Sequence, residues 1–577
     1  MKKLLVYMKY YKKETVLAPL FKMLEASFEL FVPLVMAAIV DVGIANSDYP
    51  YIIKMGLLLV LLAVVGLATS VTAQFFSAKA AVGFTAKIKK VLFTHIQSMS
   101  YAQTDMAGTS TLITRLTNDM NQVQSGVNLV LRLFLRSPIV VFGAMIMAFT
   151  IDVKAAFIFV VTIPLLSIVV FGIMLISIPL YKKVQAALDK VLGITRENLS
   201  GVRVIRAFCR EKEEQELFDT YNDNLTNLQM FVGKISALMN PVTYIIVNGA
   251  TIVLIYTGAV QVDEGILTRG EVIALVNYMS QILVELVKLA NLIITVTKAV
   301  ACGNRIQAVL DEPAGIRVYE ETGASEEQAG NKVVFEHATL RYPGAGADSL
   351  SDIHVAVKKG ETIGIIGGTG SGKSSLVQMI PRFYDATGGR VLVDGKDVKT
   401  YEPEVLREKV GMVPQKAVLF RGTIRDNICW GKKDATDEEI WQALERAQAK
   451  EFVAEKDGQL EFEVQQGGRN LSGGQKQRLT IARALVKQPE ILILDDSASA
   501  LDYATDAALR KAIRELSDEM TVFIVSQRTA SVLHADRIIV LEDGDVAGIG
   551  THEELLASCA VYKEIHESQL SGGKGAK

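Results

Sequence analysis

The sequence predicts a two-part fold: an α-helical transmembrane domain with six spans and long cytosolic helix extensions, followed by an α/β domain with a phosphate-binding loop. Two observations predict the membrane part. Apolar residues are concentrated in the first half, and they form stretches longer than the roughly 20 residues that cross a bilayer as helix. A third observation predicts the α/β part, since a glycine-rich loop lies between a β-type run and a helical run.

The composition limits the class of protein. Half of the 577 residues are hydrophobic and 21% are charged, with a mean hydropathy of +0.28. These values exclude disorder and indicate either an unusually large core or residues in lipid. The 61 basic and 63 acidic side chains nearly balance, so we expect no nucleic-acid partner. The four cysteines are far apart and form no CxxC or Cys/His group, which argues against disulfides and a zinc site.

Three stretches, 55–78, 155–181 and 235–262, contain no charged residue and predict membrane spans. Three further apolar stretches carry charges, so buried amphipathic helices of a soluble domain remain an alternative for them. Because they alternate with membrane segments, we prefer six spans, at about 16–44, 52–76, 127–151, 155–181, 235–262 and 271–297.

Charged residues within or near the spans are costly in lipid and often functional. We favour structural roles for them. Glu285 and Lys288 have the spacing of an i,i+3 pair, and Arg132 and Arg136 are expected to extend to the inner headgroups. The remaining two are Glu25 and Glu29.

The distribution of lysine and arginine predicts the orientation. The first 13 residues contain five lysines, whereas the segment 41–51 after the first span contains no basic residue, which places the amino terminus inside. The long basic connections 79–126 and 182–234 fall on the same side. We therefore expect a multi-pass protein of the plasma or bacterial inner membrane, with the amino terminus and the α/β domain in the cytoplasm.

The predicted domain bounds are 1–310 for the transmembrane domain and 331–570 for the α/β domain. Between them, 311–330 is rich in acidic residues, glycine and proline and predicts a linker. The last residues, 571–577, predict a flexible tail.

The segment GGTGSGKS at 367–374 fits the pattern G-x-x-x-x-G-K-[ST], directly after an apolar strand and before a helical run. Such a match arises by chance about once in fifty sequences of this length. Backbone N–H groups of the loop can surround phosphates, Lys373 can reach the β and γ oxygens, and Ser374 can ligate magnesium. The candidate phosphate-binding residues are Gly367, Gly368, Thr369, Gly370, Ser371, Gly372, Lys373, Ser374 and Ser375.

The run 491–495 reads as a buried strand that ends in Asp495. A strand ending in aspartate is structural more often than catalytic when it stands alone. Beside a phosphate loop, its carboxylate is suited to hold the magnesium shell.

Between these two motifs stands the segment Leu471, Ser472, Gly473, Gly474 and Gln475. On its own it fits a plain turn, but at the start of a helix it exposes N–H groups and a hydroxyl that suit an anion. LSGGQ between a phosphate loop and an aspartate-ended strand resembles the signature of ATP-binding cassette (ABC) proteins. Six spans followed by one cassette are similar to the half-transporters of the ABC exporter family, and the resemblance covers nearly the whole chain.

The resemblance implies ATP and Mg²⁺ as cofactors, with Ser374, Gln415 and Asp495 as metal ligands. Gln415 matches the glutamine that touches magnesium and faces the membrane domain. Tyr342 matches the aromatic side chain that stacks on adenine, although a core tyrosine is a competing interpretation.

The resemblance also implies contacts between domains. Ser499 and Asp502 match the loop that links two cassettes in a dimer. The segments 99–124 and 197–208 resemble the two inner loops whose tips dock on cassettes.

Two catalytic positions depart from the family pattern. Asp496 stands where the family has a glutamate that orients and deprotonates water, and Gln527 stands at the position of the switch histidine. The shorter side chain withdraws the carboxylate by about 1.5 Å, and misplacement of about 1 Å can lower a rate about a hundredfold. We expect a site that holds Mg-ATP but turns over very slowly; the alternative is that Asp496 works as a shorter base.

This pattern resembles the degenerate-site subunit of heterodimeric multidrug exporters. It implies a non-identical half-transporter partner with the catalytic glutamate and the switch histidine, hydrolysis mainly at that partner's site, and a small lipophilic or amphipathic substrate. The alternative is a homodimeric or regulatory membrane protein that binds ATP with little turnover. The spans exclude a soluble cassette ATPase, and the order of domains disfavours an importer.

Overall fold

The computed structural model describes residues 1, 3–313, 315, 318–319, 330–498, 500–516 and 520–572. The chain divides into two compact units: unit 1 comprises Met1–His95 and Ser110–Pro313, and unit 2 comprises Ile96–Thr109 and Ala314–Lys577. Most of the predicted linker 311–330, and 573–577 of the predicted tail, lie outside the described residues. The described part of that tail continues helix α20 (Ala560–Gly572).

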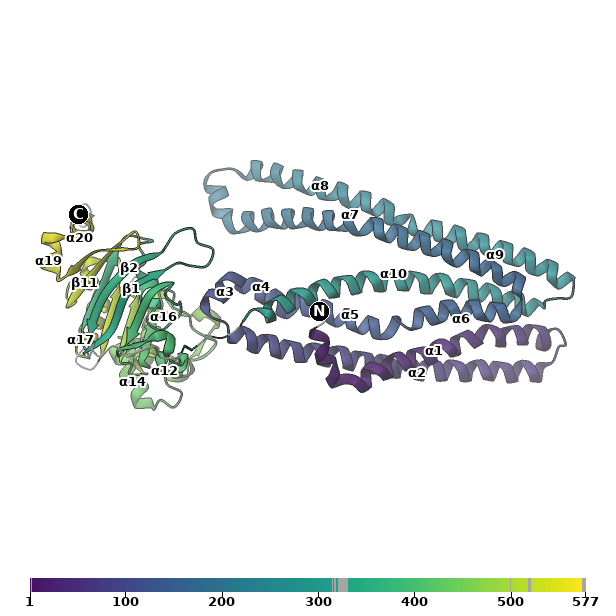
Figure 1. Cartoon of the computed structure of the whole chain (residues 1–577), viewed down its shortest axis with the longest axis horizontal. Helices are drawn as coiled ribbons and strands as arrows, with labels where there is room; N and C mark the ends of the chain where they lie inside the picture. The colour runs from purple at the N-terminus through teal and green to yellow at the C-terminus, as the bar shows by residue number, and fades with distance from the viewer. Residues whose placement is uncertain are drawn as a thin grey trace. The chain divides into compact units, whose positions relative to one another are not determined.

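Unit 1 is helical (Figure 1). Among its described residues, six helical stretches are long and apolar enough to cross a membrane, which confirms the predicted six spans. The longest helix, α7 (Val153–Ala207), has 55 residues and is therefore about 80 Å long, compared with about 30 Å for the hydrocarbon core of a bilayer. Helix α7 therefore extends far beyond the lipid. The six stretches are Leu4–Ile44, Tyr49–Gln97, Thr109–Ile151, Val153–Ala207, Glu211–Asp263 and Arg269–Asp311.

These stretches contain shorter elements. The elements other than α7 are η1 (Leu4–Tyr11), α1 (Lys12–Ala38), η2 (Ile39–Ile44), α2 (Tyr49–Gln97), α4 (Thr109–Thr114), η3 (Arg115–Asp119), α5 (Met120–Leu133), α6 (Arg136–Ile151), α8 (Glu211–Ala237), α9 (Met239–Asp263) and α10 (Arg269–Asp311).

The third stretch is interrupted inside the predicted span 127–151. Helix α5 ends at Leu133 and α6 begins at Arg136. Pro138 has no N–H group to bond the carbonyl oxygen of Phe134, four residues earlier, so the hydrogen-bond ladder breaks there. The break places Arg136 and Ser137 in the first turn of a new helix.

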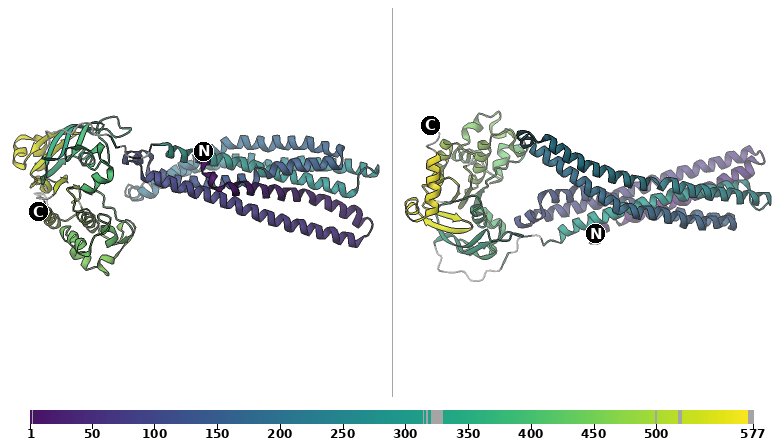
Figure 2. Two further views of the ribbon diagram at one scale, coloured as in Figure 1. Left: turned by 60° about the horizontal axis from the view of Figure 1, so that its bottom comes forward. Right: turned by 90° about the horizontal axis from the view of Figure 1, so that it is seen from above.

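Helix α10 is the central helix of unit 1. It packs against α1, α5, α6, α7 and α9, and Figures 1 and 2 show it running between α7 and α9 on one side and α5 and α6 on the other. Polar contacts fix its register: the Tyr278 hydroxyl donates to the Leu30 carbonyl oxygen at 2.6 Å, and the Gly270 N–H donates to Asp41 at 2.7 Å.

The expectation that Arg136 extends to the headgroups is wrong. Its side chain is only 10% exposed and forms ion pairs with Glu285 Oε1 at 2.8 Å and Glu29 Oε2 at 2.6 Å. An unpaired charge in lipid is unfavourable, and two carboxylates within reach stabilise the guanidinium where it is. The predicted Glu285–Lys288 pair is present, with 2.8 Å between Lys288 Nζ and Glu285 Oε1.

Unit 2 is an α/β domain with two main sheets. The larger sheet has the order β12-β11-β3-β10-β9-β6, and the smaller sheet has the order β2-β1-β4-β5. In the larger sheet the strands from β11 to β6 are parallel. One hydrophobic core, including Phe335, Ile365 and Leu376, joins the two sheets and α11. A second core, including Leu479 and Leu494, joins β9 to α16.

The strands are β1 (Asn331–Leu340), β2 (Leu350–Lys358), β3 (Thr362–Gly367), β4 (Gly388–Val393), β5 (Lys396–Asp397), β6 (Val410–Val413), β7 (Gly422–Thr423), β8 (Glu463–Val464), β9 (Ile491–Asp495), β10 (Thr521–Val525), β11 (Arg537–Glu542) and β12 (Asp545–Gly550). The helical elements besides α20 are α3 (Tyr101–Ala107), α11 (Lys373–Gln378), η5 (Val398–Thr400), α12 (Pro403–Lys409), α13 (Ile424–Cys429), α14 (Asp437–Arg446), α15 (Lys450–Ala454), η6 (Gln459–Glu461), η7 (Gln466–Gly468), α16 (Gly473–Leu485), α17 (Tyr503–Arg514), α18 (Thr529–Val532) and α19 (His552–Ser558).

The close approach of α5 and α10 gives a stability prediction. A Cβ atom added at Gly126 would lie 2.2 Å from Ala299 Cβ, whereas one added at Gly172 on α7 would meet nothing within 4 Å. We expect Gly126→Ala to lower the stability of the detergent-solubilised protein by about 1–3 kcal/mol through overpacking, measured by thermal unfolding. Gly172→Ala is the matched control and is expected to leave the unfolding temperature unchanged or slightly raised. Equal unfolding temperatures for the two variants would contradict this packing.

Candidate nucleotide-binding site

Three neighbouring parallel strands of the larger sheet bring the predicted site residues to one edge. Strand β10 lies between β3 and β9, with Val525 paired to Ile365 on one side and to Asp495 on the other. The carboxyl ends of parallel strands meet at the same edge of a sheet, where α/β proteins bind ligands. The segments that follow these three strands therefore start side by side.

The phosphate-binding loop follows β3 and leads into α11. Gly370 and Gly372 have φ values of +88° and +91°, which favour glycine. A Cβ atom at Gly367 would lie 2.1 Å from the Leu541 carbonyl oxygen, so this position cannot hold a side chain without a backbone shift. Gly368, Thr369 and Gly370 are exposed at the tip of the loop, while Ser371 is buried.

Lys373 is the first residue of α11 and its side chain folds back onto the loop. Its ammonium group donates to the carbonyl oxygens of Gly367 and Gly368 at 2.9 and 2.5 Å. Burial lowers the pKa of Lys373, and the nearby carboxylates of Asp496 and Asp495 act in the opposite direction. The loop thus concentrates positive charge where a phosphate is expected.

Four predicted residues form two hydrogen-bonded pairs at the same edge. The Ser374 hydroxyl donates to Asp495 Oδ1 at 2.8 Å, and Gln415 Nε2 donates to Asp496 Oδ2 at 3.3 Å. Asp495 is 2% exposed, and burial raises its pKa while the hydrogen bond from Ser374 opposes this shift. A hydroxyl, a carboxylate and an amide oxygen are the hard oxygen donors that Mg²⁺ prefers, so these residues fit a magnesium site.

Tyr342 follows β1, and its surroundings fit in part both a core tyrosine and an aromatic side chain that stacks on adenine. Its hydroxyl lies 2.9 Å from Ser375 Oγ, one residue after the loop, and its ring packs edge-on against Tyr384 with 4.9 Å between ring centroids. The ring is half-buried at the border of the core that joins the two sheets. It therefore lies beside the phosphate loop with part of its surface accessible.

The LSGGQ segment forms the start of α16. Ser472 is the N-cap, and Ser472 and Gln475 form a capping box in which each side chain accepts a hydrogen bond from the other residue's N–H, at 3.3 and 3.0 Å. Leu471 is buried, whereas Ser472 and Gly473 are exposed. Within the described residues, no hydrogen bond joins this segment to the phosphate loop of the same chain.

The predicted dimer loop lies beside this segment. A Cβ atom at Gly474 would lie 3.1 Å from the Ala500 carbonyl oxygen. Asp502 is the N-cap of α17 and accepts the Thr505 N–H at 2.9 Å, which lowers its pKa. Ser499 lies outside the described residues.

Gln527 follows β10 and is exposed. No motif in the sequence indicates the residue that holds its backbone, which is Gln569 on the C-terminal helix α20. Gln569 Nε2 donates to the Gln527 carbonyl oxygen at 2.8 Å, while Gln569 Oε1 accepts the Thr529 N–H at 2.9 Å and the Thr529 hydroxyl at 3.0 Å. One amide side chain thus fixes the loop between β10 and α18.

The short helix α3 belongs to unit 2 although it comes from the amino-terminal half of the chain. Its Tyr101 ring stacks on Phe383 with 4.3 Å between centroids, and its Asp105 accepts a hydrogen bond from the Tyr384 hydroxyl. Burial and the hydrogen bond to Asp105 raise the pKa of Tyr384. Because Tyr384 also contacts Tyr342, these contacts lead from α3 to the edge of the candidate site.

Comparison with known proteins identifies the class of this site. Residues 15–286 match the family described as ABC transporter transmembrane region, and residues 350–499 match the family ABC transporter. An uncharacterized ABC transporter ATP-binding protein of Mycobacterium tuberculosis is 37% identical over 97% of this chain and 96% of its own length. The chain belongs to the ABC transporter family.

Further similarities extend over the whole chain. An uncharacterized ABC transporter ATP-binding protein of Bacillus subtilis is 36% identical over 100% of both chains. A second Bacillus subtilis protein, whose name refers to multidrug export, is 33% identical over 99% of both. The solved structure of a bacterial Atm1-family ABC exporter with ATP bound has the same fold, with a TM-score of 0.79 and 22% identity over 97% of this chain and 98% of that chain.

Membership of the ABC family defines the general activity. The chain combines a multi-pass membrane domain with a following ATP-binding domain of a family of ATP-hydrolysing transporters, and its fold is that of an ABC exporter. A lipid bilayer and a transported substrate are therefore among its partners.

The position of Lys373 predicts its effect on nucleotide binding. Removing a charged hydrogen-bond donor that contributes about 1.5–3 kcal/mol lowers affinity about 10- to 150-fold. We expect this loss for Lys373→Ala, measured by equilibrium binding of a fluorescent ATP analogue in the presence of Mg²⁺. Lys359→Ala, which removes an exposed lysine of the turn after β2, is the control and is expected to bind normally. Equal affinities would contradict the placement of the phosphates at this loop.

The contacts of Gln569 predict a local effect on dynamics. Gln569→Ala removes the acceptor of the Thr529 N–H, and a hydrogen bond of about 0.5–1.5 kcal/mol corresponds to about 2- to 12-fold faster amide exchange. We expect this increase at Thr529 by hydrogen–deuterium exchange. Glu564→Ala, an exposed change on the same helix, is expected to have no effect. Unchanged exchange at Thr529 in the Gln569 variant would refute the proposed support.

Proposed function

We propose that this chain is one subunit of a heterodimeric ATP-driven exporter. Its own ATP site mainly binds nucleotide, and its LSGGQ segment completes the hydrolytic site of a second, non-identical half-transporter. The partner contains the catalytic glutamate and the switch histidine. The observation that carries the proposal is the pair Asp496 and Gln527 at the two positions where the family has glutamate and histidine.

The surroundings of Asp496 support slow turnover. The residue has a φ of +44° and donates its backbone N–H to the Val525 carbonyl oxygen at 3.0 Å, so its backbone is fixed to β10. An aspartate on this fixed backbone ends about 1.5 Å short of a glutamate carboxylate. A general base that is withdrawn by this distance is poorly placed to accept a proton from water.

Gln527 supports the same conclusion on chemical grounds. Its backbone is fixed by Gln569, and the side chain ends in a neutral amide. A histidine can exchange a proton and carry a charge near neutral pH, whereas an amide does neither. The loop is therefore built to present a side chain at the site edge, and that side chain has no acid–base chemistry.

Nucleotide binding depends on other residues, and these are in place. Lys373 and the loop amides suit the phosphates, and Tyr342 beside Ser375 suits the base. Ser374, Asp495 and Gln415 supply oxygen donors for Mg²⁺, which neutralises phosphate charge when bound. We therefore assign Mg-ATP binding to this site and place the faster hydrolysis at the partner's site.

The exposed signature supports an interface with another cassette. Ser472 and Gly473 lie at the surface at the start of α16, where free backbone N–H groups favour an anion. In unit 1 the tip between α7 and α8 also exposes large apolar side chains, with Leu199 and Phe208 both 74% exposed. Exposed apolar tips of this kind are typical of docking sites, and we assign this one to the partner's cassette.

The transport cycle follows from these assignments. We place the amino terminus and the cassette in the cytoplasm of a cell membrane, with domain bounds near 310 and 331. ATP binding closes two cassettes, and the stacking of Tyr101 on Phe383 transmits this movement to the spans, which then alternate between inward and outward access. The multidrug name of one relative supports a small lipophilic or amphipathic substrate.

The heterodimer proposal is tested in the purified two-chain complex. Asp496→Asn is expected to leave ATPase activity within about twofold of wild type, because this site contributes little turnover. The corresponding glutamate-to-glutamine change in the partner is expected to lower activity about 100-fold or more. Equal losses from the two variants would refute the assignment of roles.

The same preparation distinguishes the alternative of a homodimeric or regulatory ATP-binding protein. The chain alone is expected to bind ATP but to show no brisk ATP-dependent transport in proteoliposomes. Rapid transport by the chain alone would overturn the heterodimer proposal.

A further inference from the structure

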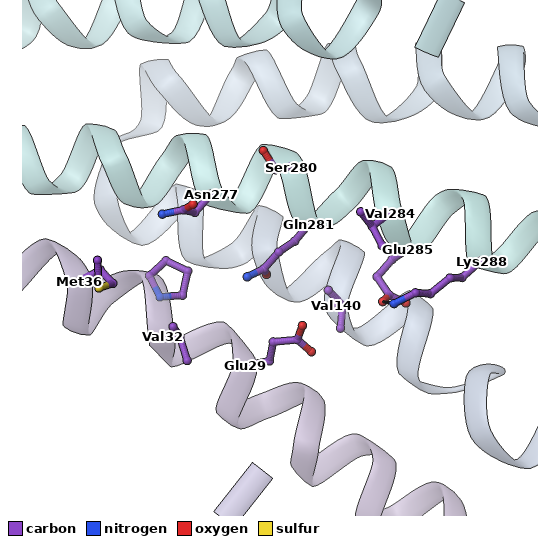
Figure 3. Close-up of a pocket in the computed structure, with 11 residues that line it drawn as sticks. Glu29, Val32, Met36, Val140, Asn277, Ser280, Gln281, Val284, Glu285 and Lys288 are labelled. Atoms are coloured by element: carbon purple, nitrogen blue, oxygen red, sulfur yellow. Dashed lines mark hydrogen bonds and ion pairs between the residues drawn. The ribbon is translucent and has the colours of Figure 1, made fainter. Parts of the chain in front are cut away.

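A cavity of about 460 Å³, open to the surface of unit 1, lies between α1, α6 and α10. This size is within the usual range for small-molecule sites. Figure 3 shows that α1 and α10 supply most of its wall and face each other across it. All the residues that line it belong to unit 1.

The buried charges beside the cavity are largely satisfied by one another. Glu285 is 4% exposed and accepts hydrogen bonds from Arg136 and Lys288 on Oε1 and from Ser137 on Oε2, all at 2.8 Å. Arg136 is 10% exposed and bridges Glu285 and Glu29. These contacts connect the start of α6 to α1 and α10. Arg136 and Glu285 therefore have structural roles.

Glu29 differs from Glu285 in its accessibility. Its side chain is 41% exposed, and among the described residues only Oε2 has a hydrogen-bond partner, Arg136. Figure 3 shows its carboxylate directed into the cavity from α1, opposite Gln281 on α10. Glu29 therefore presents an acceptor oxygen to the interior.

The cavity is charged at one end, and both amide and apolar side chains line the rest of its length. Glu285 and Lys288 lie at one end, Met36 and Asn277 lie at the other, and Glu29 faces Gln281 between them (Figure 3). Glu29 and Met36 are seven residues apart on α1, which corresponds to about 10 Å along the helix. Gln281 lies between the ends, and its Oε1 is buried without a hydrogen-bond partner among the described residues. The cavity thus offers a charged end, a free amide acceptor and an apolar wall.

From this arrangement we infer that the cavity is the site for amphipathic amines, with a protonated amino group bound by Glu29 and the apolar body along Val32, Met36 and Val284. The inference rests on the proposed export function, because it specifies the substrate class of that exporter.

Charge favours an amine over an acid or a neutral compound. Two carboxylates and one ammonium group line the cavity, and the Arg136 guanidinium lies beside it. Both cations are already paired, Lys288 with Glu285 and Arg136 with Glu285 and Glu29, whereas one oxygen of Glu29 has no partner among the described residues. A ligand carboxylate would lie near Glu29 and be repelled. A protonated amine donates to the free oxygen of Glu29 and to Gln281, and charge-assisted hydrogen bonds are stronger away from water.

Binding of three fluorescent probes to the full chain in lipid nanodiscs without nucleotide tests this inference. The probes are dansylcadaverine, its neutral N-acetyl derivative and the anionic dansyl-aminohexanoate, which share one aromatic body. We expect the amine to bind at least tenfold more tightly than the amide and the acid to bind weakest, as measured by fluorescence anisotropy. Equal affinities for the three would overturn the inference.

Three variants locate the site. Glu29→Gln is expected to lower affinity for the amine about tenfold and to leave the amide unchanged, which also shows that the cavity is intact. Glu25→Gln removes a charge one turn away on the same helix, outside the lining, and is expected to bind normally. Val284→Phe fills the cavity and is expected to abolish binding of all three probes. Unchanged amine binding in the Glu29 or the Val284 variant would refute the site.

The binding result and the transport result are independent. Amine selectivity in a protein without ATP-driven export would refute the proposed function and leave the site in place. Export that proceeds without amine selectivity would refute only the site.

Discussion

The alignment of three parallel strands is the constraint on which the nucleotide site depends. Because β3, β10 and β9 are neighbours in register, the phosphate loop, Asp495 with Asp496, and the segment before Gln527 all begin at one edge of the sheet. The phosphate loop is more than a hundred positions away from Asp495 in the chain, and no local feature of the sequence holds them together. The parallel ladder does so by pairing backbone groups whose side chains are buried on both faces.

A different constraint shapes the membrane unit. In lipid each polar group needs a partner from the protein, and α10 supplies many of them through Tyr278, Gly270 and Glu285. The break before α6 is part of this arrangement, since it places Arg136 and Ser137 together at a helix start where both reach Glu285. A proline that interrupts one span thus coincides with the polar contact that ties three helices together.

Local patterns in the sequence predict those features of the structure that depend on neighbouring residues alone. Glycine spacing predicted the phosphate loop because Gly370 and Gly372 need positive φ, and apolar length predicted the six helices. Features that depend on distant contacts were not predictable. Arg136 meets Glu285 across 149 positions and Gln569 meets Gln527 across 42, and neither pair has a spacing signal. The break at Phe134 was accessible from Pro138, but a hydropathy scan does not register a missing N–H group.

The proposed binding and catalytic positions differ in how far the fold depends on them. Asp495 is buried, and the Ser374 hydroxyl donates to it, so loss of Ser374 leaves a buried carboxylate without that donor, which costs about 1–3 kcal/mol or more. Lys373 likewise satisfies loop carbonyl oxygens. Gln527 is exposed and is held through its backbone by Gln569, so the identity of its side chain does not affect folding. The residues that we propose to bind nucleotide also stabilise the domain, whereas the proposed switch position, Gln527, contributes little to it. A subunit whose partner hydrolyses ATP can therefore lose catalytic side chains without losing its fold or its nucleotide site.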